Sequence, residues 1–109
     1  MQRDIAFLGS SLGDLRQLPQ GARRAAGYQL NKLQDNERPD DWKPMPGIGN
    51  GVAEIRIRDS SGAYRVVYVA KFAEAIYVLH VFTKKRQKTA SADIGLARAR
   101  YRELLRTRL

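Results

Sequence analysis

Residues 52–82 read VAEIRIRDSSGAYRVVYVAKFAEAIYVLHVF and carry the strongest secondary-structure signal of the chain. Hydrophobic and polar residues alternate from Val52 to Arg58, as in a strand with one buried face. Ser60, Ser61 and Gly62 supply a turn. Two further strand-like segments follow at Ala63–Lys71 and Glu74–Phe82, with a short connection between them. The stretch therefore predicts a three-stranded antiparallel meander.

Toward the N-terminus the pattern changes from strand to helix. Residues Asp4 to Leu8 form a short apolar run that predicts a first strand. A short helix is expected from Ser11, which has capping-box spacing to Asp14. A second helix is expected after Pro19. Its apolar stripe, at spacings of four and three, is Ala22, Ala26, Leu30 and Leu33.

Beyond the meander the chain becomes strongly basic. Residues 84–88 read KKRQK, and Ser91 is expected to cap a final helix that carries Asp93 in its first turn. A loop rich in proline and glycine, Arg38–Gly51, joins the second helix to the meander. The order β-α-α-β-β-β-α predicts one α+β domain over residues 1–109. It consists of an N-terminal strand and helical hairpin, an antiparallel meander and a C-terminal helix, with the helices on one face of the sheet.

Strand parity predicts a cationic face on this sheet. We expect Arg58 to pair with Arg65 in the first hairpin, and Lys71 with Ala75 in the second. This register collects on one face Glu54, Arg56, Arg58, Arg65 and, past the last strand, Lys85. The opposite face is apolar and carries Phe82 and His80, which is interpreted as a core histidine. Because opposed like charges destabilise a sheet, the paired arginines indicate a functional role. The arginines of the final helix fit a solvated surface.

Composition narrows the class of function. The formal net charge is +9, and such a surface attracts polyanions. The absence of cysteine excludes disulfides, thiolate metal sites and a cysteine nucleophile, and the single histidine argues against a histidine-rich metal site. No apolar run approaches the ~20 residues of a membrane span, and residues 1–4 lack the layout of a secretory signal. We expect a cytoplasmic protein that binds nucleic acid, with no cofactor and no membrane partner.

Four segments, in order, resemble the RelE/ParE superfamily of toxins. Residues 43–56, KPMPGIGNGVAEIR, resemble the lead into its second strand, and residues 64–68, YRVVY, resemble its central strand. Residues 77–85, YVLHVFTKK, resemble its last strand and basic exit. The ADI of residues 92–94, followed by Ala97 and Arg98, is similar to the closing helix of the HigB-like, phage Gp49-like branch. The resemblance extends from Phe7 over most of the chain.

The resemblance implies the toxin of a type II toxin–antitoxin pair, a ribosome-dependent endoribonuclease that cuts mRNA and inhibits translation. In such relatives the 2′-hydroxyl attacks the adjacent phosphate, and basic side chains stabilise the developing charge without a metal. By position the resemblance assigns catalytic roles to Arg56, Arg65 and Lys85. The basic residues expected to bind RNA are Arg58, Lys84, Arg86 and Lys88. Glu54 stands where RelE has another lysine.

Two other functions stay open at this point. ParE-like toxins of the same fold inhibit DNA gyrase by binding it, without nuclease activity. A plain nucleic-acid-binding module would bind with strong salt dependence and cause no growth arrest. The expected partners of the toxin are a cognate helix-turn-helix antitoxin of the HigA-like kind, the ribosome and mRNA. RelE carries a tyrosine shortly after its basic tract, whereas residues 89–92 here read TASA. We interpret Asp93 as a first-turn helix stabiliser rather than a base.

Overall fold

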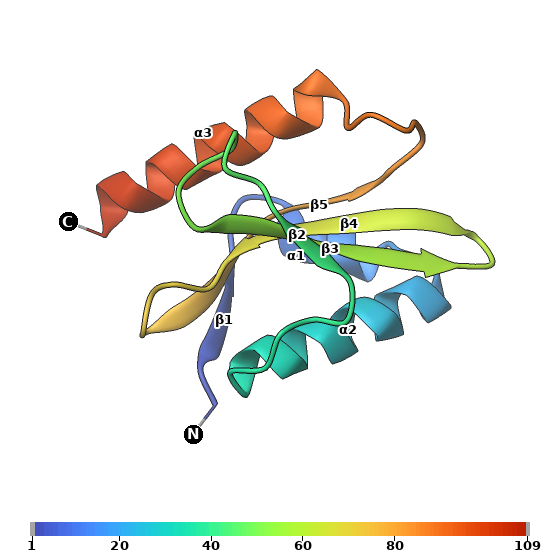
Figure 1. Ribbon diagram of the computed structural model, residues 1–109, viewed down its shortest axis with the longest axis horizontal. Coiled ribbons are helices and arrows are strands. Elements are labelled where there is room, and N and C mark those ends of the chain that lie inside the picture. Colours follow the sequence, from blue (N-terminus) through green and yellow to red (C-terminus); the bar gives the residue numbers. More distant parts are fainter. Residues whose placement is uncertain (1, 109) are drawn as a thin grey trace.

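The computed structural model describes residues 2–108, which form one five-stranded sheet and three helices (Figure 1). In chain order the elements are β1 Asp4–Phe7, α1 Ser11–Arg16, α2 Gln20–Gln34, β2 Trp42–Pro44, β3 Val52–Asp59, β4 Gly62–Val69, β5 Ala75–Thr83 and α3 Ser91–Thr107. The predicted order of elements is confirmed, with β2 as an addition inside the predicted loop. None of these helices is long and apolar enough to cross a membrane.

The strands lie in the order β1-β5-β4-β3-β2. The meander β3-β4-β5 is antiparallel, as predicted, and β1 pairs with β5 in parallel. The short strand β2 forms the far edge, where Lys43 pairs with Glu54. Strand β2 was not predicted because it has only three residues and ends in Pro44. Proline is excluded from the middle of a sheet but is tolerated on an edge strand.

The helices cover both faces of the sheet, so the prediction that they share one face was wrong. Helices α1 and α2 pack on one face, and α3 crosses the other (Figure 1). The reason lies in the central strands, where residues of both parities are apolar and fully buried, such as Val66 and Val67 on β4 and Val78 and Leu79 on β5. Strands with two apolar faces need cover on both sides.

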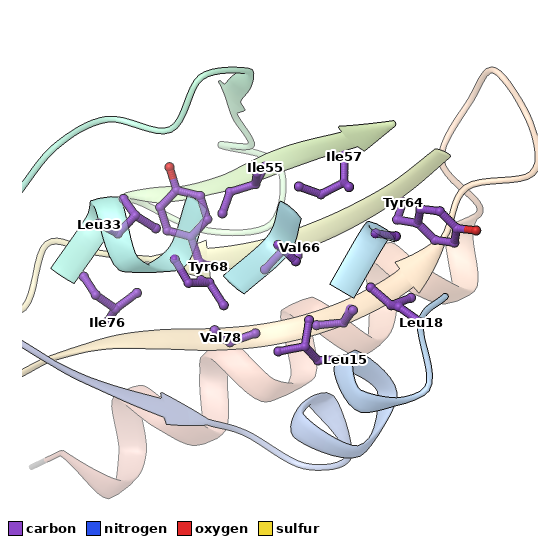
Figure 2. Close-up of a cluster of buried hydrophobic side chains, with 14 of the residues drawn as sticks. Leu15, Leu18, Leu33, Ile55, Ile57, Tyr64, Val66, Tyr68, Ile76 and Val78 are labelled. Atoms are coloured by element: carbon purple, nitrogen blue, oxygen red, sulfur yellow. The ribbon is translucent and has the colours of Figure 1, made fainter. Parts of the chain in front are cut away.

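The predicted stripe of α2 is confirmed and forms most of the first core. Ala22, Ala26, Leu30 and Leu33 are all buried against the sheet. Figure 2 shows Leu15, Leu18 and Leu33 over Ile55, Val66 and Val78. The predicted caps were wrong. Ser11 lies inside α1, where its Oγ donates to the Val78 carbonyl at 3.3 Å, and Ser91 is the first residue of α3 after the N-cap Ala90.

Both predicted hairpin registers need correction. In the first hairpin Arg56, rather than Arg58, pairs with Arg65, a shift of two residues that preserves which face each side chain occupies. In the second hairpin the predicted register holds for Tyr68 and Val78, but a β-bulge between Val67 and Tyr68 shifts the remainder by one residue. Because one residue of slip reverses the faces, His80 and Phe82 join the face of Arg65 instead of the α2 side.

Three arginines of α3 make hydrogen bonds that hold the helix in place. The predicted solvated surface is confirmed for Arg98 and Arg108, which are exposed, whereas Arg100 is partly buried. Arg98 Nε donates to the Gly47 carbonyl at 2.7 Å, and Arg100 Nη1 donates to the Leu79 carbonyl at 2.9 Å. Arg108 makes two hydrogen bonds to Glu74, of 2.6 and 2.9 Å, and these lower the pKa of that carboxyl to about 2. The side of α3 that faces the sheet is therefore anchored along most of its length.

Candidate functional site

The candidate site begins at the paired arginines of β3 and β4. Arg56 and Arg65 are direct partners across the ladder, on the face that α3 covers in part. Between them lies Glu54, which is 1% exposed. Its Oε1 is 3.7 Å from Arg56 Nε and 3.6 Å from Arg65 Nε. The carboxylate offsets the repulsion that two opposed guanidinium groups would otherwise produce.

Arg65 is buried but incompletely paired. It is 7% exposed, and its Nη1 donates to the Tyr64 carbonyl at 3.1 Å. Its Nε is buried without a hydrogen-bond partner, because the 3.6 Å distance to Glu54 Oε1 is too long for a hydrogen bond. The other carboxylate oxygen, Glu54 Oε2, is also buried without a partner. Burial lowers the pKa of Arg65, and Glu54 opposes that effect. Arg65 is therefore a fixed, largely buried cation that is only partly satisfied by hydrogen bonds.

Lys84 continues the same face beyond the end of β5. Its backbone N–H donates to the Ala63 carbonyl at 2.8 Å, which extends the ladder by one residue. Lys84 thereby has the parity of Phe82, the partner of Arg65. Burial lowers the pKa of Lys84, and the nearby Arg65 lowers it further. Lys85 was predicted to extend the face of Arg65, and this parity was wrong because the bulge shifts the register of β5 by one residue.

Two open cavities lie around these cations. One, of about 320 Å³, is lined by Arg58, Ala63, Arg65, Lys84, Lys85, Arg86 and Gln87. The other, of about 280 Å³, is lined by Phe82, Thr83, Lys84, Lys85, Arg86, Lys88, Ala90 and Asp93. Six of the seven predicted site residues therefore line one or both cavities. Arg56 lines neither, and its side chain, 37% exposed, lies near Glu54 and Asp41.

A buried histidine, which was predicted to belong to the core on the opposite side, contacts two residues that line the second cavity, Phe82 and Asp93. His80 Nε2 is 2.7 Å from Asp93 Oδ1, and the imidazole stacks on Phe82 with ring centroids 4.9 Å apart. His80 is 6% exposed, whereas the Asp93 side chain is 27% exposed at the cavity wall. No local signal in the sequence pairs these residues, because the bulge determines the face of His80. Within residues 2–108, no three His, Asp or Glu side chains gather as metal ligands.

Comparisons with known proteins agree with this architecture. The family model of phage-derived Gp49-like proteins (DUF891) matches residues 13–102. A search of curated proteins found no match. Among solved structures, the chain is similar to the Escherichia coli toxin RelE, in the free state of a mutant with two arginines replaced by alanine. That match has a TM-score of 0.68 at 21% identity and covers 92% of this chain and 98% of the RelE chain. The fold is thus the RelE fold, and the chain belongs to the phage-derived Gp49-like family of RelE/HigB-like toxins.

Proposed function

We propose that this protein is the toxin of a type II toxin–antitoxin pair and acts as a metal-independent endoribonuclease on ribosome-bound mRNA. The observation that carries the proposal is the buried, incompletely paired Arg65 in the wall of a cavity that four further cations line. A solvated charge run would not bury a guanidinium, because desolvation of an ion is costly. Membership of a toxin family supports the same conclusion and implies a cognate antitoxin.

The cavity suits stabilisation of a phosphorane-like transition state. When the 2′-hydroxyl attacks the adjacent phosphorus, negative charge builds on the non-bridging oxygens. The bond to the 5′-oxygen then breaks, leaving a 2′,3′-cyclic phosphate and a 5′-hydroxyl. Arg65 is held by Glu54 and the Tyr64 carbonyl and lines the cavity, so it supplies positive charge without reorganisation. We assign catalytic roles to Arg65 and Lys85, which line this cavity, and to Arg56, which lies outside it and pairs with Arg65 across the ladder.

The remaining cations suit the RNA backbone. Arg58, Lys84, Arg86 and Lys88 surround the same two cavities, and cations of this kind bind successive phosphates without reading sequence. The half-buried position of Lys84 beside Arg65 also supports a share in catalysis for this lysine. Lys85 lines both cavities from an exposed position.

The test compares arginine variants on ribosomes programmed with a defined mRNA, with cleavage ends mapped by primer extension. Arg65→Ala should lower the cleavage rate about a hundredfold or more, as expected for loss of an electrostatic stabiliser. Arg65→Lys should restore part of the rate, since lysine lacks the bidentate fork. Arg24→Ala removes the same charge from an exposed position on α2 and should cleave at the parental rate.

Growth measurements separate the proposal from gyrase inhibition. Expression of the toxin should arrest growth, and Arg65→Ala should relieve the arrest in parallel with its loss of cleavage. Growth arrest that persists in folded Arg65→Ala, together with inhibited supercoiling by purified gyrase, would contradict a nuclease. We expect the antitoxin, a helix-turn-helix protein of the HigA-like kind, to present acidic or apolar groups to the cationic face or to α3. Complementary potentials make such an association faster at low salt.

A further inference from the structure

The basic segment of residues 84–90 links β5 to α3 and is fixed by hydrogen bonds at its two ends. At its start Lys84 N–H donates to the Ala63 carbonyl at 2.8 Å. Just past its end, in the first turn of α3, Asp93 is 2.7 Å from His80 on β5. Figure 1 shows this connection arching from the end of β5 to the start of α3. The position of its lysines and arginines over the sheet therefore depends on how these two ends are held.

We infer that His80 and Asp93 act as a positioning pair that holds the start of α3 and the basic segment over Arg65, an inference that rests on the proposed ribonuclease function. His80 lies opposite Val67, two ladder pairs away from Phe82 and Arg65 and therefore on the same face of the sheet. Asp93 lines the cavity that contains Lys84 and Lys85. The His80–Asp93 hydrogen bond thus joins strand β5 to the wall of the cavity that carries the lysines.

The pair also keeps a carboxylate away from the cations it would neutralise. Asp93 is the one acidic residue among the eight that line this cavity, and four of the others are Lys84, Lys85, Arg86 and Lys88. With the proton on His80 Nε2, the imidazole donates to Asp93 Oδ1 and occupies that oxygen. Without this donor, the carboxylate is free to turn toward a lysine of the rim, where it would compete with a phosphate.

The rest of α3 is anchored independently, so the pair acts locally. Tyr101 donates its hydroxyl to the Asn50 carbonyl at 2.6 Å, Arg100 binds the Leu79 carbonyl and Arg108 binds Glu74. These contacts lie from two to four helical turns beyond Asp93. Loss of the His80–Asp93 bond should therefore loosen the first turn of α3 and the basic segment while the remainder of the helix stays packed.

The experiment uses four variants of the full chain, each with a defined change to one bond. His80→Leu and Asp93→Ala remove the donor and the acceptor. His80→Gln places an amide donor near the position of Nε2, and Asp93→Asn keeps the Oδ1 acceptor without its charge. Arg102→Ala, at an exposed position of α3, is the matched control. His80 is buried, so a His80 variant can fail to fold. Asp93 is partly exposed, and its variants then test the same hydrogen bond.

Two readouts are measured on folded protein. Steady-state cleavage of ribosome-bound mRNA should show kcat lower by about tenfold or more in His80→Leu and Asp93→Ala, because misplaced cations weaken transition-state stabilisation. KM should rise by a smaller factor, because the same segment carries three of the residues assigned to RNA binding. His80→Gln and Asp93→Asn should recover most of that loss. Hydrogen exchange should be faster at residues 84–93 in the first two variants and unchanged at residues 97–104.

The outcomes that overturn the inference are distinct from the outcome that overturns the proposed function. If the parental protein cuts no RNA, the nuclease proposal fails, while hydrogen exchange still tests the positioning pair. If Asp93→Asn is as impaired as Asp93→Ala, the charge rather than the bond matters and the positioning role is wrong. Unchanged exchange at residues 84–93 in both His80→Leu and Asp93→Ala would also overturn it.

Discussion

Glu54 provides the sharpest test of how the cationic face is held together. Its carboxylate is 1% exposed and lies between two arginines that pair across the sheet. A buried carboxylate among cations has two opposing effects on stability. It loses hydration, which favours unfolding, and it compensates the buried charge of Arg65, which favours folding. The variant Glu54→Gln removes the charge with little change in shape, so the sign of its effect shows which term is larger.

The geometry indicates that charge compensation is larger. Two unit charges about 4 Å apart interact by about 4 kcal/mol at an effective dielectric constant of 20. Glu54 has one such neighbour in the buried Arg65, at 3.6 Å, and a second in the more exposed Arg56, at 3.7 Å. Removing one partner of a buried pair costs about 3–5 kcal/mol, and the amide oxygen of glutamine should recover part of it. We expect Glu54→Gln to lose about 2–3 kcal/mol of unfolding free energy.

Urea unfolding followed by circular dichroism measures this loss directly. At about 4–8 °C per kcal/mol for a domain of this size, the melting temperature should fall by on the order of 10 °C or more. Glu103→Gln is the matched control, because this glutamate is exposed on α3 and pairs only with Arg106 among the described residues; its effect should stay within about 0.5 kcal/mol. A Glu54→Gln protein as stable as the parent, or more stable, would refute the compensation argument.

Two further predictions concern Lys84 beside Arg65 and the ion pair between Glu74 and Arg108. Lys84→Ala should lower the rate of mRNA cleavage more than Lys85→Ala, because Lys84 is half-buried on the face of Arg65 and Lys85 is exposed. Equal losses on programmed ribosomes would show that the position of Lys84 on this face has no special role in cleavage. The Glu74–Arg108 pair should stabilise the fold in a pH-dependent way. Arg108 lowers the pKa of Glu74 from 4.5 to about 2, so its contribution is complete above pH 4.5 and is lost as the pH falls through 2. The melting temperatures of parent and Glu74→Gln should therefore differ above pH 4.5 and converge toward pH 2, and a constant difference would exclude this linkage.

The order of the elements was predictable because it depends on local periodicity. The spacing of Ala22, Ala26, Leu30 and Leu33 specifies one buried stripe on a helix, and each of these residues is buried. The alternation of Ile55 and Ile57 with charged neighbours specifies a strand in the same way. These signals are contained within one element, so no knowledge of its neighbours is needed. The RelE-like resemblance rested on the same segments in the same order.

The site was less predictable because its geometry depends on one bulge. Between the bulge and the connection from β4 to β5, the predicted pairing of Tyr68 with Val78 is confirmed. In the part of β5 that follows the bulge, each residue pairs one position away from its predicted partner. This shift places His80 and Phe82 on the face of Arg65, and Lys84 continues that face. No residue type signals that slip in the sequence. Helical periodicity likewise cannot distinguish Arg98 or Arg100, which bind backbone carbonyls, from an arginine in solvent.

The bulge also explains how one face of the sheet supports both a core and a charged site. Leu79 has no partner in the ladder, and it packs with Ala97 and Tyr101 beneath α3. The next residue, His80, lies on the same side of the sheet and binds Asp93 at the start of α3. In a regular strand, two consecutive residues would point to opposite faces. Leu79 has no paired residue on β4, and its carbonyl accepts a hydrogen bond from Arg100 of α3 at 2.9 Å. The β-bulge therefore joins two halves of this face: an apolar half that α3 covers and a charged half that α3 leaves open. The same bulge is the reason that the register of β5 was predicted wrongly.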